Sequence, residues 1–311
     1  MDYDPGLWYG AFAASATSIV YRPRNVSTET QTLAWFDVRG NKIGVTSNPG
    51  VFRGVSLAPD GKTIATLCGD PDTNVCLIHA DGTVTQIDRG GISGALAWAP
   101  DSSAVAYAKH QGPNRFEVSL KPLDNALSER TILNNSKDSW PMAWLPKSTE
   151  LLLARTLDGG RCEAVVMNIS SGAIQQFLPA SDGLFHSASF SPDGKWVAYD
   201  KGVDGRYELY IASFPNPSVS YRITKEGGSS PKWRSDGRVY FLGADEKLYS
   251  VAVTQTNGAL KFGDPRSLFH PPILSAPWDR NSFDISRDGT RVLVNSSSSS
   301  NPSELVLLTE R

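Results

Sequence analysis

The stretch that decides the fold is Ala188-Ser-Phe-Ser-Pro-Asp-Gly-Lys-Trp-Val-Ala-Tyr199. Its first half alternates packed and small side chains with period two, which is the pattern of a β-strand. Pro-Asp-Gly then supplies a tight turn, because Pro fixes φ at the first corner and Gly accepts the left-handed conformation. The apolar run after the turn predicts the second strand of a hairpin.

The same pattern recurs along the chain, clearly in four further segments and weakly in two more. Aligned at the turn, the seven copies fall at Thr17, Asp60, Asp101, Lys147, Asp193, Asp236 and Asp288. Successive copies lie 41 to 52 residues apart. A period of this length, with several short strands in each unit, is typical of a β-propeller blade.

Two more strands follow each hairpin in most units, as in 164–168 and 208–212 for the third strand and 220–224 for the fourth. Four antiparallel strands make one blade. Seven units of about 45 residues need about 315 residues, and the chain has 311. We therefore expect an all-β fold, a single β-propeller of four-stranded antiparallel blades, with seven blades and six as the alternative.

The expected domain spans 1–311. The expected blades are 8–47, 51–90, 92–134, 138–179, 184–225, 228–270 and 281–311. The last unit supplies two strands around Asp288 and a third at 304–308, so its outer strand has to come from elsewhere. Residues 6–9 can add that strand and remove an exposed edge. The alternative is that residues 1–10 only lead into the first blade.

Charge and hydropathy exclude several classes of partner. The chain has 30 Lys plus Arg against 32 Asp plus Glu, a formal net charge of -2. Nothing in this balance attracts a phosphate backbone or an anionic membrane. No stretch approaches the roughly 20 apolar residues that a membrane helix needs. We expect no nucleic acid partner and no membrane insertion by this segment.

The three cysteines, Cys68, Cys76 and Cys162, cannot all pair within one chain, and they lack the spacing of a zinc site. A link between Cys68 and Cys76 across neighbouring strands is one interpretation, and three small buried hydrophobic residues are the other. The amino terminus has neither the basic start nor the apolar stretch of a signal peptide. We expect either a cytosolic protein or a fragment whose targeting segment has been removed.

The segment 189–199, with the strand 209–213 and the residues 222–224 after it, resembles the TolB-like propeller repeat. The repeat lacks the Gly-His and Trp-Asp signatures of WD repeats. The resemblance covers nearly the whole chain. It implies the fold, and it implies little about function.

A second resemblance lies in 12–22, 33–40 and 49–53, and in the ending from 283 to 308. These segments look like the propellers attached after the kinase domain in some bacterial serine/threonine protein kinases. The resemblance implies a sensory or binding module outside the membrane. The chain contains no Gly-rich loop, His-Arg-Asp or Asp-Phe-Gly, so it would be the propeller alone.

The sequence lacks the motifs of the common enzyme classes. Prolyl oligopeptidase-type enzymes also carry such propellers, but no Gly-x-Ser-x-Gly, His-Glu-x-x-His, P-loop or dinucleotide fingerprint occurs here. The histidines fall in different units at non-equivalent positions: His79, His110, His186 and His270. We therefore expect no metal, no cofactor and no catalytic residue. The acidic turn residues are expected to stabilise turns, and Trp98, Trp144 and Trp233 to pack in the core.

A ligand site is expected at the mouth of the central channel, where the residues just ahead of each inner strand converge. Repeat positions that serve only structure look alike around a ring, and these positions do not. The residues selected as ligand-binding are Arg53, Trp140, His186, Arg280 and Asn281. The two arginines are permanently charged, Trp140 offers a flat aromatic surface and His186 can titrate, a set that suits an anionic or peptide ligand. The alternative is ordinary loop residues, and Tyr207, in another connection, can line either face.

Two hypotheses of function follow. The first is a non-catalytic propeller that binds a protein, a peptide or a small anionic ligand, as the sensory or scaffolding part of a larger bacterial signalling protein. The second is a propeller enzyme of the lyase or lactonase type, with a metal at the channel mouth. Three or more His or carboxylate ligands converging on the axis would identify the second.

Overall fold

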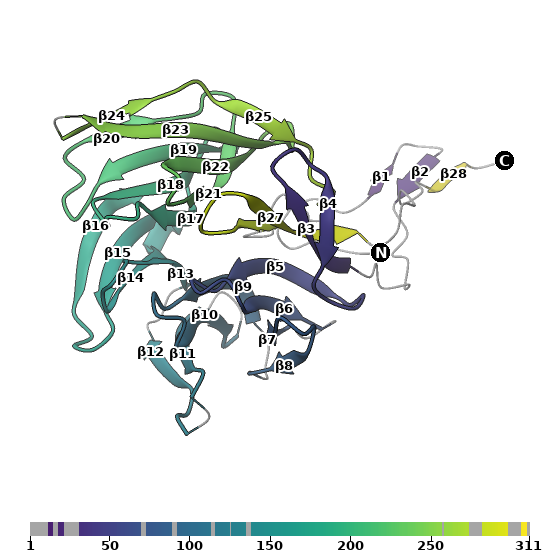
Figure 1. The fold of residues 1–311 in the computed structure, drawn as a ribbon, viewed down its shortest axis with the longest axis horizontal. Helices are drawn as coiled ribbons and strands as arrows, with labels where there is room; N and C mark the ends of the chain where they lie inside the picture. The colour runs from purple at the N-terminus through teal and green to yellow at the C-terminus, as the bar shows by residue number, and fades with distance from the viewer. Residues whose placement is uncertain are drawn as a thin grey trace.

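The computed structural model describes residues 12–14, 18–21, 31–69, 73–88, 92–112, 116–124, 126–134, 138–256, 258–273, 282–297 and 306–309. Within these residues the chain forms strands β1 to β28 and one short 3-10 helix, η1 (Asp158–Gly160). Six antiparallel sheets are arranged as the blades of a ring, and β1, β2 and β28 form a separate three-stranded sheet (Figure 1).

Four blades follow the order of the chain, each with its first strand innermost. Blade 1 holds β5 (Phe52–Leu57), β6 (Ile64–Cys68), β7 (Asn74–Ile78) and β8 (Val84–Gln86). Blade 2 holds β9 (Ile92–Trp98), β10 (Ala104–His110), β11 (Phe116–Pro122) and β12 (Arg130–Leu133). Blade 3 holds β13 (Ser139–Trp144), β14 (Glu150–Thr156), β15 (Cys162–Asn168) and β16 (Ile174–Ser181). Blade 4 holds β17 (Phe185–Phe190), β18 (Trp196–Val203), β19 (Arg206–Ser213) and β20 (Ser220–Arg222).

The last two blades depart from this pattern. Blade 5 holds β21 (Gly228–Trp233), β22 (Arg238–Gly243), β23 (Leu248–Thr256), β24 (Ala259–Phe262) and β25 (Arg266–Phe269). Both β24 and β25 pair with the long β23. Blade 6 holds β26 (Phe283–Ile285), β27 (Arg291–Ser297), β3 (Gln31–Asp37) and β4 (Lys42–Val45). Two strands from each end of the chain therefore build one blade.

The prediction of seven blades is wrong: the ring has six. The units predicted as the first and the last blade are two halves of blade 6, because β27 pairs with β3 along seven residues of each strand. The remaining strands of those units, β1 (Phe12–Ala14), β2 (Ser18–Tyr21) and β28 (Val306–Thr309), pair with one another outside the blades. The proposed closing strand 6–9 lies outside the described residues, and β3 and β4 close the ring.

The turn chemistry accounts for the repeated hairpins. In five blades the acidic residue of the turn accepts a hydrogen bond from the backbone N–H two residues later. The carboxylates are those of Asp60, Asp101, Asp193, Asp236 and Asp288. In Pro192-Asp193-Gly194 the glycine has φ 71°, the left-handed region that a glycine adopts without strain. The predicted turn role of these carboxylates is confirmed.

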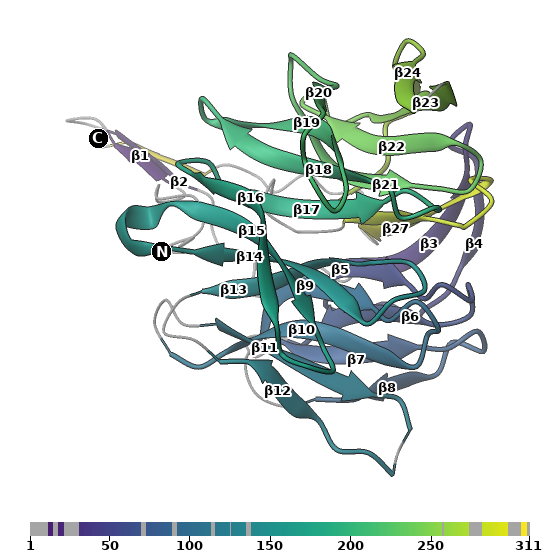
Figure 2. The same ribbon diagram turned by 90° about the vertical axis from the view of Figure 1, so that its left-hand side faces the viewer.

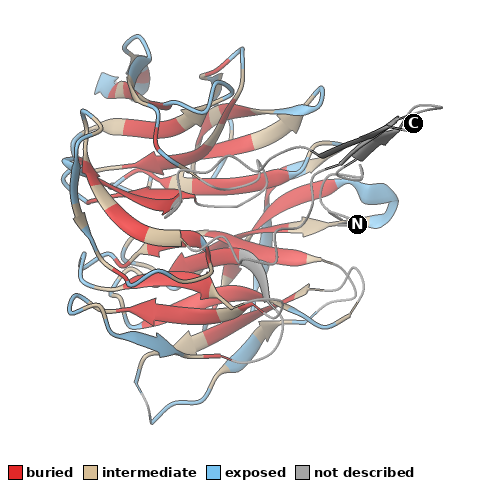
Figure 3. Cartoon of the chain, turned by 90° about the vertical axis from the view of Figure 1, so that its right-hand side faces the viewer, coloured by how far each residue is buried: buried red, intermediate tan, exposed pale blue. Residues whose placement is uncertain are grey.

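Hydrophobic cores fill the seams between blades, where strands of neighbouring sheets face each other (Figures 2 and 3). Six clusters of buried side chains are present among the described residues, and they correspond to the six seams. Leu33 belongs to the cluster between blades 6 and 1, and its strand neighbour Ala34 to the one between blades 5 and 6. Trp98 and Trp233 are buried in such cores, as predicted.

The six inner strands surround the axis of the ring. Going around the ring, β5 contacts β9, β9 contacts β13, β13 contacts β17, β17 contacts β21, and β26 contacts β5. Residues at or just after the ends of β21 and β26 are linked as well: the Arg234 guanidinium binds the Asp284 carboxylate, and the hydroxyl and backbone N–H of Ser235 donate to the Arg287 carbonyl at 2.6 and 3.3 Å. This last seam is thus held partly by charge.

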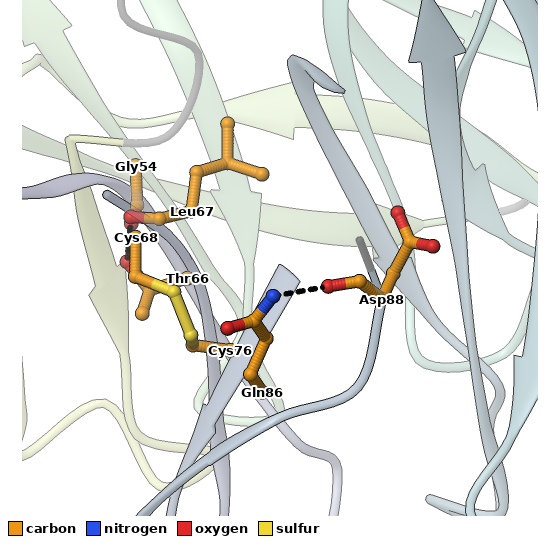
Figure 4. Close-up of a disulfide and its surroundings, with 7 residues drawn as sticks. All are labelled: Gly54, Thr66, Leu67, Cys68, Cys76, Gln86 and Asp88. Atoms are coloured by element: carbon orange, nitrogen blue, oxygen red, sulfur yellow. Dashed lines mark hydrogen bonds between the residues drawn. A yellow bond between two sulfur atoms is a disulfide. The ribbon is translucent and has the colours of Figure 1, made fainter. Parts of the chain in front are cut away.

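Cys68 and Cys76 form a disulfide between β6 and β7 of blade 1, with their Cα atoms 5.9 Å apart (Figure 4). The interpretation as a cross-strand link is the one that the structure shows. Cys162 is a buried free thiol on β15.

Candidate functional site

A large cleft opens on the face of the ring where the inner strands begin, which we call the entry face. Its volume is about 1220 Å³. It is lined by Arg161, 180–184, 201–207, 227–230, 242–244, Glu246, 270–273 and Ser282. Most of these residues come from the connections into β17 and β21 and from the hairpins β18–β19 and β22–β23. Arg161 lies between β14 and β15, and 270–273 and Ser282 lie between β25 and β26. The cleft therefore spans the tops of blades 3, 4 and 5.

Close backbone packing shapes the cleft wall. A Cβ atom at Gly183 would lie 1.8 Å from the Gly202 carbonyl oxygen, so this position admits only glycine without a shift of the backbone. The Gly202 N–H donates to the Leu184 carbonyl at 2.9 Å. The connection into blade 4 and the β18–β19 hairpin are thus joined by their backbones, which makes this wall a preformed surface.

Asp200 organises the layer beneath the cleft. Its side chain is fully buried on β18, where the same repeat position holds Leu67, Ala108 and Ala154 in blades 1 to 3. One carboxylate oxygen accepts from the backbone N–H groups of His186 (3.1 Å) and Ser187 (2.6 Å). The other accepts from the Ser187 hydroxyl (3.0 Å) and from the Ser230 N–H (2.8 Å). One side chain therefore ties β18 to β17 and to β21 of the next blade.

Two opposing effects act on the pKa of Asp200. Burial would raise the pKa, but the nearby His186 ring and the backbone donors hold it below its usual value. The carboxylate is therefore ionised in the folded protein at neutral pH. Ser230, which lines the cleft, has φ 57°, a conformation that costs a non-glycine residue energy. The hydrogen bond from the Ser230 N–H to Asp200 helps to hold that conformation.

Replacing Asp200 with alanine is expected to lower the free energy of unfolding by about 3 kcal/mol at pH 7, because buried N–H groups lose their acceptor. The folded-state pKa of Asp200 lies below the usual value of 3.8 for an aspartate, so the stabilisation is complete above that pH and is lost as pH falls through the folded-state pKa. Urea unfolding from pH 7 to pH 3 measures both effects. Asp182→Ala, at a 99% exposed side chain, is the control and should change little. A pH-independent difference between wild type and Asp200→Ala would contradict the assignment.

His186 lies under the cleft wall and does not line the cleft. Its ring is 6% exposed, and its Nδ1 atom is 3.5 Å from a carboxylate oxygen of Asp200. The ring packs against that of Tyr207 with centroids 4.9 Å apart, and Tyr207 lines the cleft. The predicted titratable residue, His186, therefore lies behind Tyr207, and it is Tyr207 that lines the cleft.

Two other predicted site residues, Trp140 and Arg53, do not line the cleft. Trp140 is buried, and its indole N–H donates to the Phe185 carbonyl at 3.1 Å, which joins blade 3 to blade 4. Arg53 is exposed on β5 of blade 1. Arg280 and Asn281 lie outside the described residues. The structure does not bring Arg53, Trp140 and His186 together, and ligand contact by these residues stays a prediction.

Charged side chains also occupy the inner strands of blades 5 and 6. Lys232 is 8% exposed, and burial lowers its pKa, opposed by the nearby Asp284 carboxylate. Arg234 binds Asp284, which also accepts from the Leu57 N–H of blade 1 at 2.8 Å. Lys232 and Asp284 hold the repeat position that is Ser56, Ala97, Ala143 or Ser189 elsewhere. Blades 1 to 4 therefore have no charged residue at the repeat position that Lys232 and Asp284 occupy.

The described part of the chain contains neither a metal-binding cluster nor a membrane-spanning helix. No three His, Cys, Asp or Glu side chains gather there in a way that would hold a metal ion. No helix in those residues is long and apolar enough to cross a membrane.

Lys201, Asp200 and Ser230 were not predicted as site residues from the sequence. For Tyr207 the sequence did not decide which face of the ring it lines. The signal that could have found Asp200 is a charge at a repeat position that is apolar in the three preceding blades. Gly228 and Ser229, at the start of β21, line the cleft, but neither was among the residues selected from the sequence.

The fold is that of TolB-like and other β-propellers. A putative TolB from Agrobacterium tumefaciens superposes with a TM-score of 0.64 at 16% identity, covering 85% of this chain and 97% of that one. A nidogen/laminin complex chain gives 0.57 at 12% identity, covering 84% of this chain and 92% of that one. A puromycin-hydrolysing peptidase from Mycobacterium tuberculosis gives 0.54 at 14% identity, with 83% of this chain matching 44% of that one.

No protein-family model and no curated protein matches the sequence. At these identities the structural similarity shows the fold alone. The site itself therefore has to supply the argument for function.

Proposed function

We propose that this chain is a non-catalytic binding module whose ligand is a polypeptide held in the entry-face cleft. The observation that carries the proposal is the cleft itself, which is large, is built from several separate segments of the chain and has a wall joined by backbone contacts. Its lining mixes apolar side chains such as Leu184, Val203 and Ile273 with serine hydroxyls and charges. Such a mixture suits an extended chain that offers both side chains and backbone groups.

The kinase association predicted from 12–22, 33–40 and 49–53 rests on that resemblance alone. Sequencing the full coding region tests it, because a kinase domain ahead of residue 1 is the expected result. The lyase or lactonase alternative requires a metal site, and nothing in the described residues favours it over binding. That the whole chain 1–311 acts as one domain also stays a prediction.

We also propose an extracytoplasmic location. The Cys68–Cys76 disulfide supports it, because such bonds persist in oxidising compartments and are rare in the cytosol. Trapping thiols with an alkylating agent during cell lysis tests the proposal. Recovery of Cys68 and Cys76 as free alkylated thiols would contradict it.

Selection of peptides from a random displayed library tests the binding function. Peptides selected on the wild-type protein should bind Tyr207→Ala and Ser229→Arg at least about tenfold more weakly, since the first change removes a ring of the cleft and the second fills it. Gln255→Ala, at an exposed residue of β23 that does not line the cleft, is the matched control. Peptides that bind all variants equally, or no selected peptide, would overturn the proposal.

A further inference from the structure

A basic residue faces a glutamate at the same place in three consecutive blades. The pairs in register between the second and third strands are Lys109 with Glu117, Arg155 with Glu163 and Lys201 with Glu208. Blades 1, 5 and 6 have Cys68, Ala244 and Ser296 at the basic position. Because the three positions are equivalent, the surroundings of the basic side chain can be compared directly between blades 2, 3 and 4.

In blades 2 and 3 the cation is neutralised within the protein. Lys109 lies 2.8 Å from a Glu129 oxygen and 3.4 Å from an Asp88 oxygen. The Arg155 Nε binds Glu163 directly. Both side chains are partly buried, so each pair satisfies a charge that solvent reaches poorly.

Blade 4 breaks this pattern. Its glutamate, Glu208, is fully buried and accepts hydrogen bonds from Arg206 at 2.8 Å and from the Thr224 hydroxyl at 2.6 Å, and it pairs with Arg222 at 3.1 Å. The carboxylate is thus occupied by groups other than Lys201. Among the described residues no carboxylate lies within ion-pair distance of the Lys201 ammonium.

Lys201 instead faces the cleft. Its side chain is half-buried between two neighbouring strands, and the ammonium lies 5.9 Å from the centre of the Phe185 ring. The two arginines of the lining have partners in the protein: Arg161 lies beside Asp182, and Arg206 binds Glu208. Glu246 lies 3.6 Å from the His270 ring. Asp204 is exposed at the hairpin tip, where water screens it. Lys201 is the half-buried charge that the cleft leaves for a ligand.

We infer that Lys201 anchors a carboxylate of the polypeptide bound in the cleft, so that the partner is an acidic segment; this rests on the proposed function. One lysine presents a single point charge, which matches a carboxylate of one negative charge. A phosphate would need further free cations, and Arg161 and Arg206 are already paired. The ligand carboxylate would play the part that Glu129 plays for Lys109 in blade 2.

Fluorescent hexaglutamate tests the inference, with hexaglutamine and hexalysine as probes of the same length. Wild-type protein should bind hexaglutamate, and Lys201→Gln should weaken that binding about tenfold or more. Lys195→Gln changes an exposed lysine at the other end of β18, on the opposite face, and should leave the affinity unchanged. Carbodiimide, which condenses a carboxylate with an amine to an amide, should join hexaglutamate to Lys201 in the wild type.

Four results would overturn the inference: equal binding to Lys201→Gln, equal binding of hexaglutamine, cross-linking only to other lysines, or no binding of hexaglutamate. Binding of inorganic phosphate to the wild type and not to Lys201→Gln, without binding of hexaglutamate, would assign Lys201 to phosphate instead. The displayed-library selection separates this failure from that of the proposed function. Selected peptides could bind Tyr207→Ala more weakly, bind Lys201→Gln as well as the wild type, and show no enrichment in Asp or Glu. That result would support the binding module and contradict the acidic partner.

Discussion

A chain that lacks residues 1–48 is expected to lose the cooperative unfolding transition of the full protein. The deletion removes β3 and β4, which are half of blade 6. Leu33 and Ala34 are fully buried and Phe36 nearly so, and they belong to the cores on both sides of that blade. Burial of each large apolar side chain contributes about 1.5 to 3 kcal/mol, and the whole domain is stable by only about 5 to 15 kcal/mol. Urea unfolding followed by tryptophan fluorescence measures the loss.

Two companion experiments make this result specific. A chain that lacks only residues 1–22 keeps β3 and β4 and should unfold cooperatively. A synthetic peptide of residues 29–48, added to the shorter chain, should restore the transition, and a scrambled peptide should not. Cooperative unfolding of the 1–48 deletion at the wild-type midpoint would contradict the shared blade.

Replacing Arg234 with alanine is expected to destabilise the ring by about 3 kcal/mol. Asp284 is 3% exposed, and the guanidinium is its strong charge partner across the seam between blades 5 and 6. Removing one member of a buried pair leaves an uncompensated charge, which costs about 3 to 5 kcal/mol. The nearby Lys232 offsets part of that cost. The midpoint of urea unfolding at pH 7 measures the effect.

A double-mutant cycle isolates the pair. Arg234→Ala with Asp284→Ala should be less destabilised than the sum of the single changes, with a coupling of about 1 to 3 kcal/mol. Arg266→Ala, at an exposed residue of β25, should change stability by less than about 0.5 kcal/mol. If the losses of stability in the two single variants simply add up in the double variant, the Arg234–Asp284 pair does not stabilise the seam between blades 5 and 6.

Local patterns predicted the blades well, because a hairpin is decided by neighbouring residues. Pro192-Asp193-Gly194 sets a turn, and the alternating residues before it set a strand. The blade count was wrong because it depended on pairing between β27 and β3, which lie at opposite ends of the chain. Both strands carry the apolar pattern of a blade, and nothing local distinguishes two incomplete blades from two halves of one.

The residues that line the candidate cleft could not be predicted from local patterns. Positions ahead of the inner strands lead to Gly228 and Ser229 in the cleft, but unusual residues at those positions also serve the fold, as Trp140 does through its bond to the Phe185 carbonyl. Lys201 stands out only when its partners are known. Glu208, which lies opposite Lys201, pairs with Arg206 and Arg222 instead. These contacts depend on how β18, β19 and β20 are arranged in the folded blade.

Hydrogen exchange of the protein with a library-selected peptide tests most directly whether the entry-face cleft is the binding site. The bound peptide should slow exchange of backbone amides in 201–207 and 227–230, which line the cleft. Amides of the turn at 191–195, at the other end of blade 4, should exchange as in the free protein. Protection confined to that turn, with 201–207 and 227–230 unchanged, would contradict the account.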